Sequence, residues 1–459
     1  MLDKIGGLLK ISITEINNLQ EYYLYQSTSV SKHVEDNFTK YIYGLALEFY
    51  FNDVIAKMEE TRENSISFSP EINISKIKEY FVDKILENYE IQKDGQEITI
   101  TYKLKNVEKL DDKYELNPQL SRIKVNGLMQ QSHILNKSIL IMLLIKYEET
   151  IANIYRCLLE QFPQAYLNDK SITYSELILS SDIEQVKEKF IDKAVEEFMR
   201  LPLSDWYKTF SIKHNISFPC EITLTDFKEI YYRRNLIVHN QCRVNEIYIK
   251  NCNETNKKIG EELTVDNYYI ENAFNTVLIM IYGTFLGLMK LVSNKCRADM
   301  ISFIFEQGYE HMVKKQWYIS KFIFEVLKQE KKQNAEEVLY STVNYWISIK
   351  NSTGLEKIKH EIEAFDVSAM QGKFQVAKYA LLDDFCNVSN SLEKTIDKEI
   401  PASYVAEWPL FLQYRESEEY KKFQQLHQEL FKVQEYTPHD EPIDNEQEVL
   451  SELEKNIVE

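Results

Sequence analysis

Apolar residues recur at helical spacing through most of the chain. The clearest segment runs from Ile134 to Phe162 and contains an apolar run at Ile139–Ile145. It ends before Pro163, because proline cannot continue a helix. A second helix is predicted from Ser181–Glu184 to Arg200, since serine followed three residues later by glutamate is typical of a helix start.

A third helix is predicted to start near Thr225 or Asp226, either of which can serve as N-cap, and to end at Asn240 as C-cap. The residues that share one side of it by spacing are Phe227, Ile230, Tyr231, Arg234 and Val238. After a short hairpin near Ile247–Val265, Asp266 is expected to open a last helix that ends near Val292. Four or five helices around a shared core are the expected bundle.

The pattern changes on either side of this bundle. Residues 1–127 predict an α+β region of unknown role, because helical spacing from Val34 to Met58 is followed by alternation over 89–105 with an Asp-Gly turn. Residues 296–435 predict a tetratricopeptide-like array of helical hairpins without a strict repeat. Its candidate helices are Ile301–Lys314, Ser320–Lys331, Ala335–Ile349, Leu355–Phe365, Phe374–Asn387 and Glu418–Phe431. Residues 436–459 predict an acidic disordered tail.

Length and composition are consistent with a mainly α protein of two to four domains. The 459 residues include only 11 Gly and 9 Pro beside 30 Tyr and 23 Phe, which favours long helices with aromatic packing. A net charge of −18 argues against a general nucleic-acid coat protein. The charge is uneven, however, because Lys228–Lys258 carries seven Lys/Arg and three Glu, a local surplus of 7 − 3 = +4.

No signal peptide and no membrane span are predicted. The longest uncharged apolar segment, Ala273–Met289, is interrupted by polar residues and glycines and is shorter than the roughly 20 residues that cross a bilayer, so a buried helix is expected. The six cysteines show no Cys-x-x-Cys pair, which favours a reducing cytoplasm.

The residues with the clearest chemical potential are Arg234, Asn235 and His239. Arginine grips phosphate oxygens in a fork, and histidine exchanges a proton near neutral pH. RNA carries its own nucleophile, the 2′-hydroxyl, so its cleavage needs these two functions and no metal or cofactor. We expect His239 to transfer the proton and Arg234 to stabilise the phosphoryl oxygens. Asn235 would hold the phosphate or orient the ring.

The segment around these residues resembles the signature of HEPN domains, helical domains whose Arg-x-x-x-x-His motif usually has a polar residue after the arginine. The similarity extends to Glu229, to the Arg233–Arg234 pair, to Asn240 and to Val244–Asn245, and to the neighbouring helices, so we assign 128–295 to this family. The resemblance implies an endoribonuclease, a bacterial toxin or antiviral-defence effector that cuts single-stranded loops of transfer or messenger RNA. It also implies a composite active site at a homodimer interface.

Helical geometry points to the same dimer. Five steps of about 100° place Arg234 and His239 about 140° apart on a continuous helix. One helix therefore cannot present both side chains on a narrow face, whereas two copies packed face to face can bring both pairs into one cleft.

Each assignment has a plainer alternative. Arg234 can pair with Glu229 or Asp226, while His239 satisfies a helix end. Arg233 is either a second phosphate contact or a solvated surface charge. Glu229 either orients a motif residue or is an ordinary surface carboxylate, and the second alternative is favoured. The candidate substrate-binding residues are Arg233, Asn240 and Tyr232, although at least one of Tyr231 and Tyr232 is expected to pack in the core.

The rival functions belong to other classes. One is a catalytically inert HEPN-like module for dimerisation or binding, and the other is a helical-repeat scaffold that regulates a partner. For the ribonuclease itself, a regulatory protein partner is expected to bind through the helical C-terminal region. Other enzyme classes have little support, because no histidine pair has metal-ligand spacing and no phosphate-binding loop occurs.

Overall fold

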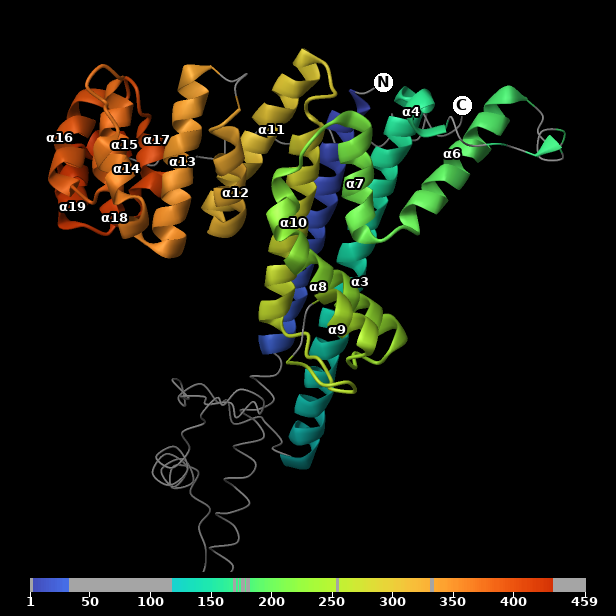
Figure 1. Ribbon diagram of the computed structural model, residues 1–459. Coiled ribbons are helices and arrows are strands. Elements are labelled where there is room, and N and C mark those ends of the chain that lie inside the picture. The colour runs from blue at the N-terminus through green and yellow to red at the C-terminus, as the bar shows by residue number, and fades with distance from the viewer. Residues whose placement is uncertain are drawn as a thin grey trace, which may run out of the picture. The chain divides into compact units, whose positions relative to one another are not determined.

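The computed structural model describes residues 3–32, 118–167, 182–252, 256–330 and 334–431, with a few single positions between 168 and 181. These residues are mainly helical and contain no β-strand, so the mainly α class is confirmed (Figure 1). Two isolated bridges join Arg243 to Glu262 and Ile396 to Ile400. The predicted helix and hairpin within 34–105, and the tail 436–459, lie outside the described residues.

The chain groups into two compact units, Met1–Gln307 and Gly308–Glu459, whereas the sequence predicts boundaries near residues 127 and 295. Residues 4–32 form a helix that belongs to the first unit. The other helices that begin in this unit are α3 (Pro118–Gln161), α4 (Pro163–Leu167), α6 (Ile183–Met199), α7 (Leu203–His214), η3 (Pro219–Thr223), α8 (Leu224–His239), α9 (Glu246–Cys252), α10 (Asn267–Leu288) and α11 (Asn294–Val313).

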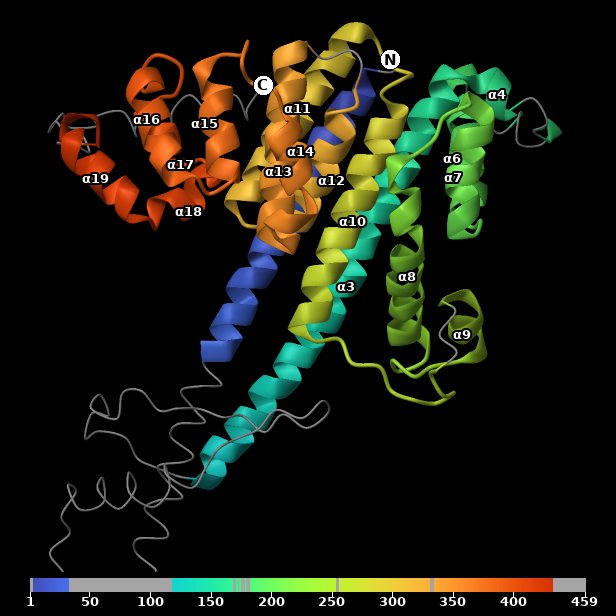
Figure 2. The same ribbon diagram turned by 60° about the vertical axis from the view of Figure 1, so that its left-hand side comes forward.

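Three long helices form the centre of the first unit. The helix of residues 4–32 lies beside α3 and α10 in both views (Figures 1 and 2). Its fully buried residues, such as Ile5 and Ile16, recur at helical spacing. Polar contacts set the register, since the Tyr23 hydroxyl donates to Asn136 Oδ1 at 3.2 Å and Thr150 Oγ1 donates to Ser12 Oγ at 2.9 Å.

The helix predicted from Ile134 to Phe162 lies within α3, but its predicted start is wrong, because α3 begins at Pro118. It ends at Gln161, and α4 begins at Pro163. The capping prediction for the next helix is wrong by one residue, because the N-cap of α6 is Asp182, whose side chain accepts from the Gln185 N–H at 2.8 Å. The Asp182 carboxylate satisfies one of the first free amides of the helix, so the helix begins one residue later than predicted.

The predicted buried helix is confirmed as α10, in which most residues after Ile270 are buried. Asp266 caps it as expected by accepting from the Tyr269 N–H at 2.7 Å, and the helix ends at Leu288. Gly283 lets η3 approach closely, since a Cβ there would lie 2.4 Å from the Cβ of Cys220. No helix in the described ranges is long and apolar enough to cross a membrane.

A buried hydroxyl chain ties α7 to this centre. The Tyr147 and Tyr207 hydroxyls are 2.7 Å apart, and Tyr207 bonds Thr284 Oγ1 at the same distance. The Thr284 hydroxyl in turn donates to the Met280 carbonyl at 2.6 Å. Because each of these three hydroxyls has a hydrogen-bond partner, the series crosses an apolar core without leaving one of them unpaired.

The second unit is a succession of helices in which α12 pairs with α13 and α15 with α16. Their bounds are α12 (Trp317–Leu327), α13 (Ala335–Thr353), η4 (Leu355–Lys357), α14 (Lys359–Ala364), α15 (Gly372–Leu381), α16 (Phe385–Thr395), α17 (Ala402–Glu407), η5 (Pro409–Phe411), α18 (Leu412–Arg415), α19 (Glu418–Leu426) and η6 (Gln428–Phe431). The single helix predicted over Phe374–Asn387 is wrong. Asp383 is left-handed, with φ 59°, and the Asp384 side chain caps a new helix.

Candidate functional site

The helix that carries the Arg-x-x-x-x-His motif is α8, which follows η3 directly. Its N-cap is Thr223, whose side chain makes no capping hydrogen bond. The predicted caps Thr225 and Asp226 therefore lie inside the first turn, and that prediction is wrong. The turn of η3 already orients the first amides of α8, so a side-chain cap at those positions is not required.

Burial changes sides along α8. Phe227 is fully buried against Tyr147 of α3, with ring centroids 4.4 Å apart, and Ile230 is also buried. Toward the C-terminal end the buried residue is Leu236, about 180° around a regular helix from Phe227. Val238, predicted to share the Phe227 side, is instead 50% exposed. The prediction of a single apolar face is therefore wrong at the C-terminal end of α8, where the buried side is opposite to that of Phe227.

Arg234 is bound to a carboxylate of another helix. Its Nη2 contacts Oε1 of Glu148 on α3, with side chains 17% and 25% exposed. The guanidinium carbon lies 5.0 Å from the ring centroid of Tyr231. Nε of Arg234 is buried without a hydrogen-bond partner in the described part of the chain. The plainer alternative of pairing with Glu229 or Asp226 is wrong, because α8 turns this side chain toward α3.

His239 and Asn235 have no such partners. His239 is the last residue of α8 and is exposed, whereas Asn235 is half-buried. Neither side chain has a hydrogen bond within the described ranges, and none joins Arg234 to His239. Because α8 is continuous from Leu224 to His239, the separation of about 140° expected between the two motif residues holds.

Asn240 is the C-cap of α8, as expected. Its N–H donates to the Leu236 carbonyl at 2.8 Å, and its Nδ2 donates to the Arg243 carbonyl at 2.6 Å. Gln241 and Cys242 follow in the left-handed region, with φ 52° and 62°. The side-chain amide of Asn240 therefore closes the turn that leaves the helix.

The connector between α8 and α10 folds back on itself. Val244 N–H donates to the Glu261 carbonyl at 2.8 Å, and Leu263 N–H donates to the Cys242 carbonyl at 2.9 Å. The hairpin predicted near Ile247–Val265 is wrong, because Ile247 belongs to α9 and the pairing amounts to one isolated bridge. The connector instead contains the short helix α9.

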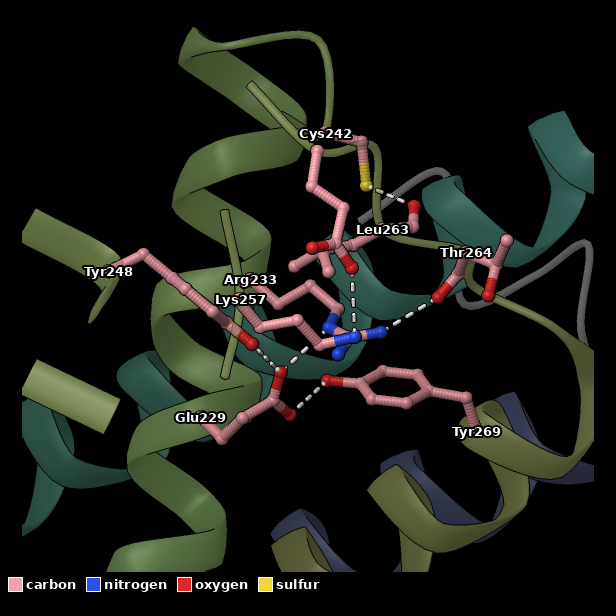
Figure 3. Close-up of polar contacts among 9 residues, drawn as sticks. Glu229, Arg233, Cys242, Tyr248, Lys257, Leu263, Thr264 and Tyr269 are labelled. Carbon is pink, nitrogen blue, oxygen red and sulfur yellow. Dashed lines mark hydrogen bonds and ion pairs between the residues drawn. The ribbon is translucent and has the colours of Figure 1, made fainter. Parts of the chain in front are cut away.

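A buried polar cluster attaches this connector to the bundle (Figure 3). The Glu229 carboxylate accepts from Arg233 Nε at 2.7 Å, from the Tyr248 hydroxyl at 2.5 Å and from the Tyr269 hydroxyl at 2.8 Å. Arg233 Nη1 also donates to the Thr264 carbonyl at 2.7 Å, and the guanidinium lies over the Tyr269 ring at 4.2 Å. Glu229 is therefore not the ordinary surface carboxylate that was expected.

Electrostatics reinforces this cluster. Burial acts to lower the pKa of Arg233, but Tyr269 and Glu229 outweigh it and raise that pKa. Burial, and then the Glu229 carboxylate, raise the pKa of the Tyr248 and Tyr269 hydroxyls, so both remain donors. A side chain 13% exposed and held on three sides is not a solvated surface charge. We assign Arg233 a structural role.

The two tyrosines next to the arginines are both half-buried. Tyr231 meets the buried Trp206 edge to face, with ring centroids 6.3 Å apart. Tyr232 meets Tyr231 at 5.9 Å, and burial raises the pKa of its hydroxyl. Tyr231 is thus the tyrosine that connects the motif to the interior, while Tyr232 lies further out.

The described residues hold no group of three or more His, Cys, Asp or Glu side chains that could bind a metal ion. Scans against protein-family models, curated proteins and solved structures gave no match to this chain.

Three contributors to this geometry were missed by the sequence reasoning. Glu148 is 86 residues from Arg234, and Tyr248 and Tyr269 are 19 and 40 residues from Glu229. No local spacing links these positions to the motif. The one available signal was the presence of tyrosines in the connector and at the start of α10.

Proposed function

We propose that this chain is a metal-independent endoribonuclease of HEPN type that acts in the cytoplasm as a toxin or antiviral-defence effector. The observation that carries the proposal is that Arg234, Asn235 and His239 lie on one continuous helix, with His239 exposed and its ring free of partners in the described part of the chain. An exposed imidazole at a helix end is available to a substrate, whereas one committed to a structural bond is not.

The chemistry divides between the imidazole of His239 and the guanidinium of Arg234. His239 removes the proton of an RNA 2′-hydroxyl, and the 2′-oxygen then attacks the adjacent phosphorus. The P–O5′ bond breaks to give a 2′,3′-cyclic phosphate, and the leaving 5′-oxygen takes a proton from water to become a free 5′-hydroxyl. Arg234 stabilises the negative charge that develops on the phosphoryl oxygens. Asn235, whose amide has no hydrogen bond in the described ranges, holds the scissile phosphate or orients the imidazole.

A second copy of the chain is required to bring the groups together. In both views α3 runs toward α4 and α8 runs away from it toward α9, so the two helices are antiparallel (Figures 1 and 2). Ile145, 42% exposed, precedes Glu148 by three residues, and Val238, 50% exposed, follows Arg234 by four. Both apolar side chains therefore lie on the same side of the ion pair. A homodimer would cover them and join Arg234 of one copy to His239 of the other.

One observation favours the second candidate, an inert HEPN-like module. The contact of Arg234 with Glu148 ties α8 to α3, which is a sufficient structural reason for an arginine at this position. In that case the chain would dimerise or bind a regulatory partner, for example through the helical pairs of the second unit, without cutting RNA.

The experiment that separates the two candidates compares the full-length wild type with Arg234→Ala and His239→Ala in cells and in vitro. Growth arrest and cleavage of transfer or messenger RNA are expected for the wild type and not for either variant. The products should end in 2′,3′-cyclic phosphate and form in the presence of EDTA. Light scattering should report a dimer for all three proteins.

Matched controls come from the same chain. Arg200, 75% exposed, and His360, fully exposed, lie outside the site, so Arg200→Ala and His360→Ala should cleave RNA like the wild type. Equal activity of wild type, Arg234→Ala and His239→Ala would leave the inert module as the conclusion.

A further inference from the structure

Within the ribonuclease site proposed above, on which this inference rests, we propose that Glu148 is a positioning residue for Arg234. The Glu148 carboxylate contacts one nitrogen of the guanidinium across the α3–α8 packing and holds the arginine in one orientation while other N–H groups remain for an RNA phosphate. Glu148 itself touches no substrate.

The carboxylate follows a well-packed residue of α3. Its neighbour Tyr147 is fully buried and packs on Phe227 of α8. The same tyrosine hydroxyl bonds Tyr207, which ties α3 to α7. These contacts therefore fix the backbone of Glu148 relative to α8. Because Arg234 lies on α8, they also fix the positions from which the two side chains meet.

A second contact, with an aromatic ring, also restrains the guanidinium. The Tyr231 ring lies 5.0 Å from its carbon, and this ring is supported by Trp206, which is fully buried. Burial, and then the Glu148 carboxylate, raise the pKa of the Tyr231 hydroxyl, so the ring remains neutral beside the cation. A carboxylate and an aromatic face together restrict a side chain that is otherwise among the most mobile.

The phosphate is expected to share Arg234 with Glu148 rather than to displace it. A phosphodiester and a carboxylate each carry one negative charge, so an exchange gains no Coulomb energy. It would also leave the Glu148 carboxylate, 25% exposed, without its cation. Glu148 engages only Nη2 of the guanidinium, and Nε is buried, so the N–H groups of Nη1 are left for the phosphate and sharing needs no such loss.

The test measures kcat and KM of the full-length protein on unfractionated transfer RNA for Glu148→Ala, Glu148→Asp and Glu148→Gln. Loss of orientation in the Ala and Asp variants should lower kcat by about tenfold to a hundredfold and change KM by less than about threefold. Glu148→Gln keeps an oxygen that accepts from Nη2 and should recover most of the lost kcat. Glu149→Gln, the same change at the adjacent exposed residue, should equal the wild type.

The alternatives give different results. Wild-type kcat in both the Ala and Asp variants would overturn the inference, and so would a lower KM in Glu148→Gln, because Glu148 would then compete with RNA. Should Glu148→Ala fail to fold, as judged by its melting curve, the Asp and Gln variants decide the matter. Arg234→Ala is measured in parallel, since full activity there means that the proposed function itself has failed.

Discussion

Arg233 and Arg234 are neighbours in the sequence, but their guanidinium groups bind carboxylates on different helices. Arg233 Nε contacts Glu229 on the same helix at 2.7 Å, and Arg234 Nη2 contacts Glu148 on α3. Successive residues of a helix point about 100° apart, so adjacent cations meet different surroundings. The first arginine holds the connector to the bundle, and the second lies where α3 meets α8. Their contributions to stability and to chemistry can therefore be separated by mutation.

The cluster around Glu229 should be a major source of stability. Glu229→Ala would leave the Arg233 guanidinium and the hydroxyls of Tyr248 and Tyr269 without their shared acceptor. Because these groups are largely buried, we expect a loss of about 3–5 kcal/mol in the free energy of unfolding. Urea denaturation measures it. Glu196→Ala breaks an exposed pair at the same i, i+4 spacing with Arg200 and should cost less than about 0.5 kcal/mol.

Substitution by alanine should change the stability of the protein in opposite directions at two glycines. A Cβ at Gly283 would lie 2.9 Å from the backbone nitrogen of Cys220, so Gly283→Ala has to push η3 away from α10. We expect a cost of about 1–3 kcal/mol. A Cβ at Gly7 meets nothing within 4 Å, and Gly7→Ala should stabilise its helix by about 0.5–1 kcal/mol. Melting temperatures that move in the same direction would contradict this packing.

His311 should make the second unit sensitive to acid. Burial lowers its pKa to about 4, although the hydrogen bond to Gln316 at 2.5 Å acts in the opposite direction. The unfolded chain takes up a proton near pH 6.5 and the folded protein only near pH 4, so stability is complete above pH 6.5 and falls between these values. The loss attributable to this side chain is about 3 kcal/mol.

His311→Gln removes the titrating group, so the difference in unfolding free energy between wild type and variant should change with pH only between about 4 and 6.5. The measurement is a denaturation series across that range. His360→Gln, at a fully exposed position, should reproduce the wild-type curve. A wild-type curve parallel to that of His311→Gln would mean that the buried histidine does not couple to folding.

Much of the fold was predictable because it depends on local signals. Proline at 163, the acceptor side chain of Asp266 and the polar Asn240 each act within a few residues of their own position, and the helix ends they predict are where the structure has them. Errors arose where two local signals competed. At Ser181 and Asp182 both residues can cap a helix, and at Asp383 one left-handed residue breaks a helix whose spacing continues beyond it.

The candidate site was predictable only in part. The order of Arg234, Asn235 and His239 on one helix follows from the sequence, and so does their angular separation. The partner of Arg234 does not, because Glu148 is 86 residues away and no spacing rule connects them. The exposure of Val238 and the burial of Leu236 likewise depend on which neighbouring elements cover the end of α8.

The sequence by itself determined the mainly helical class, the helix ends near Pro163, Asp266 and Asn240, and the single helix that presents an arginine, an amide and an imidazole, because backbone capping and periodicity are short-range effects. Tertiary structure alone decided which carboxylate each arginine binds, which side of α8 is buried and that Glu229 lies inside a cluster. Those outcomes depend on contacts between helices distant in the chain, whose packing depends on the shape and burial of whole surfaces.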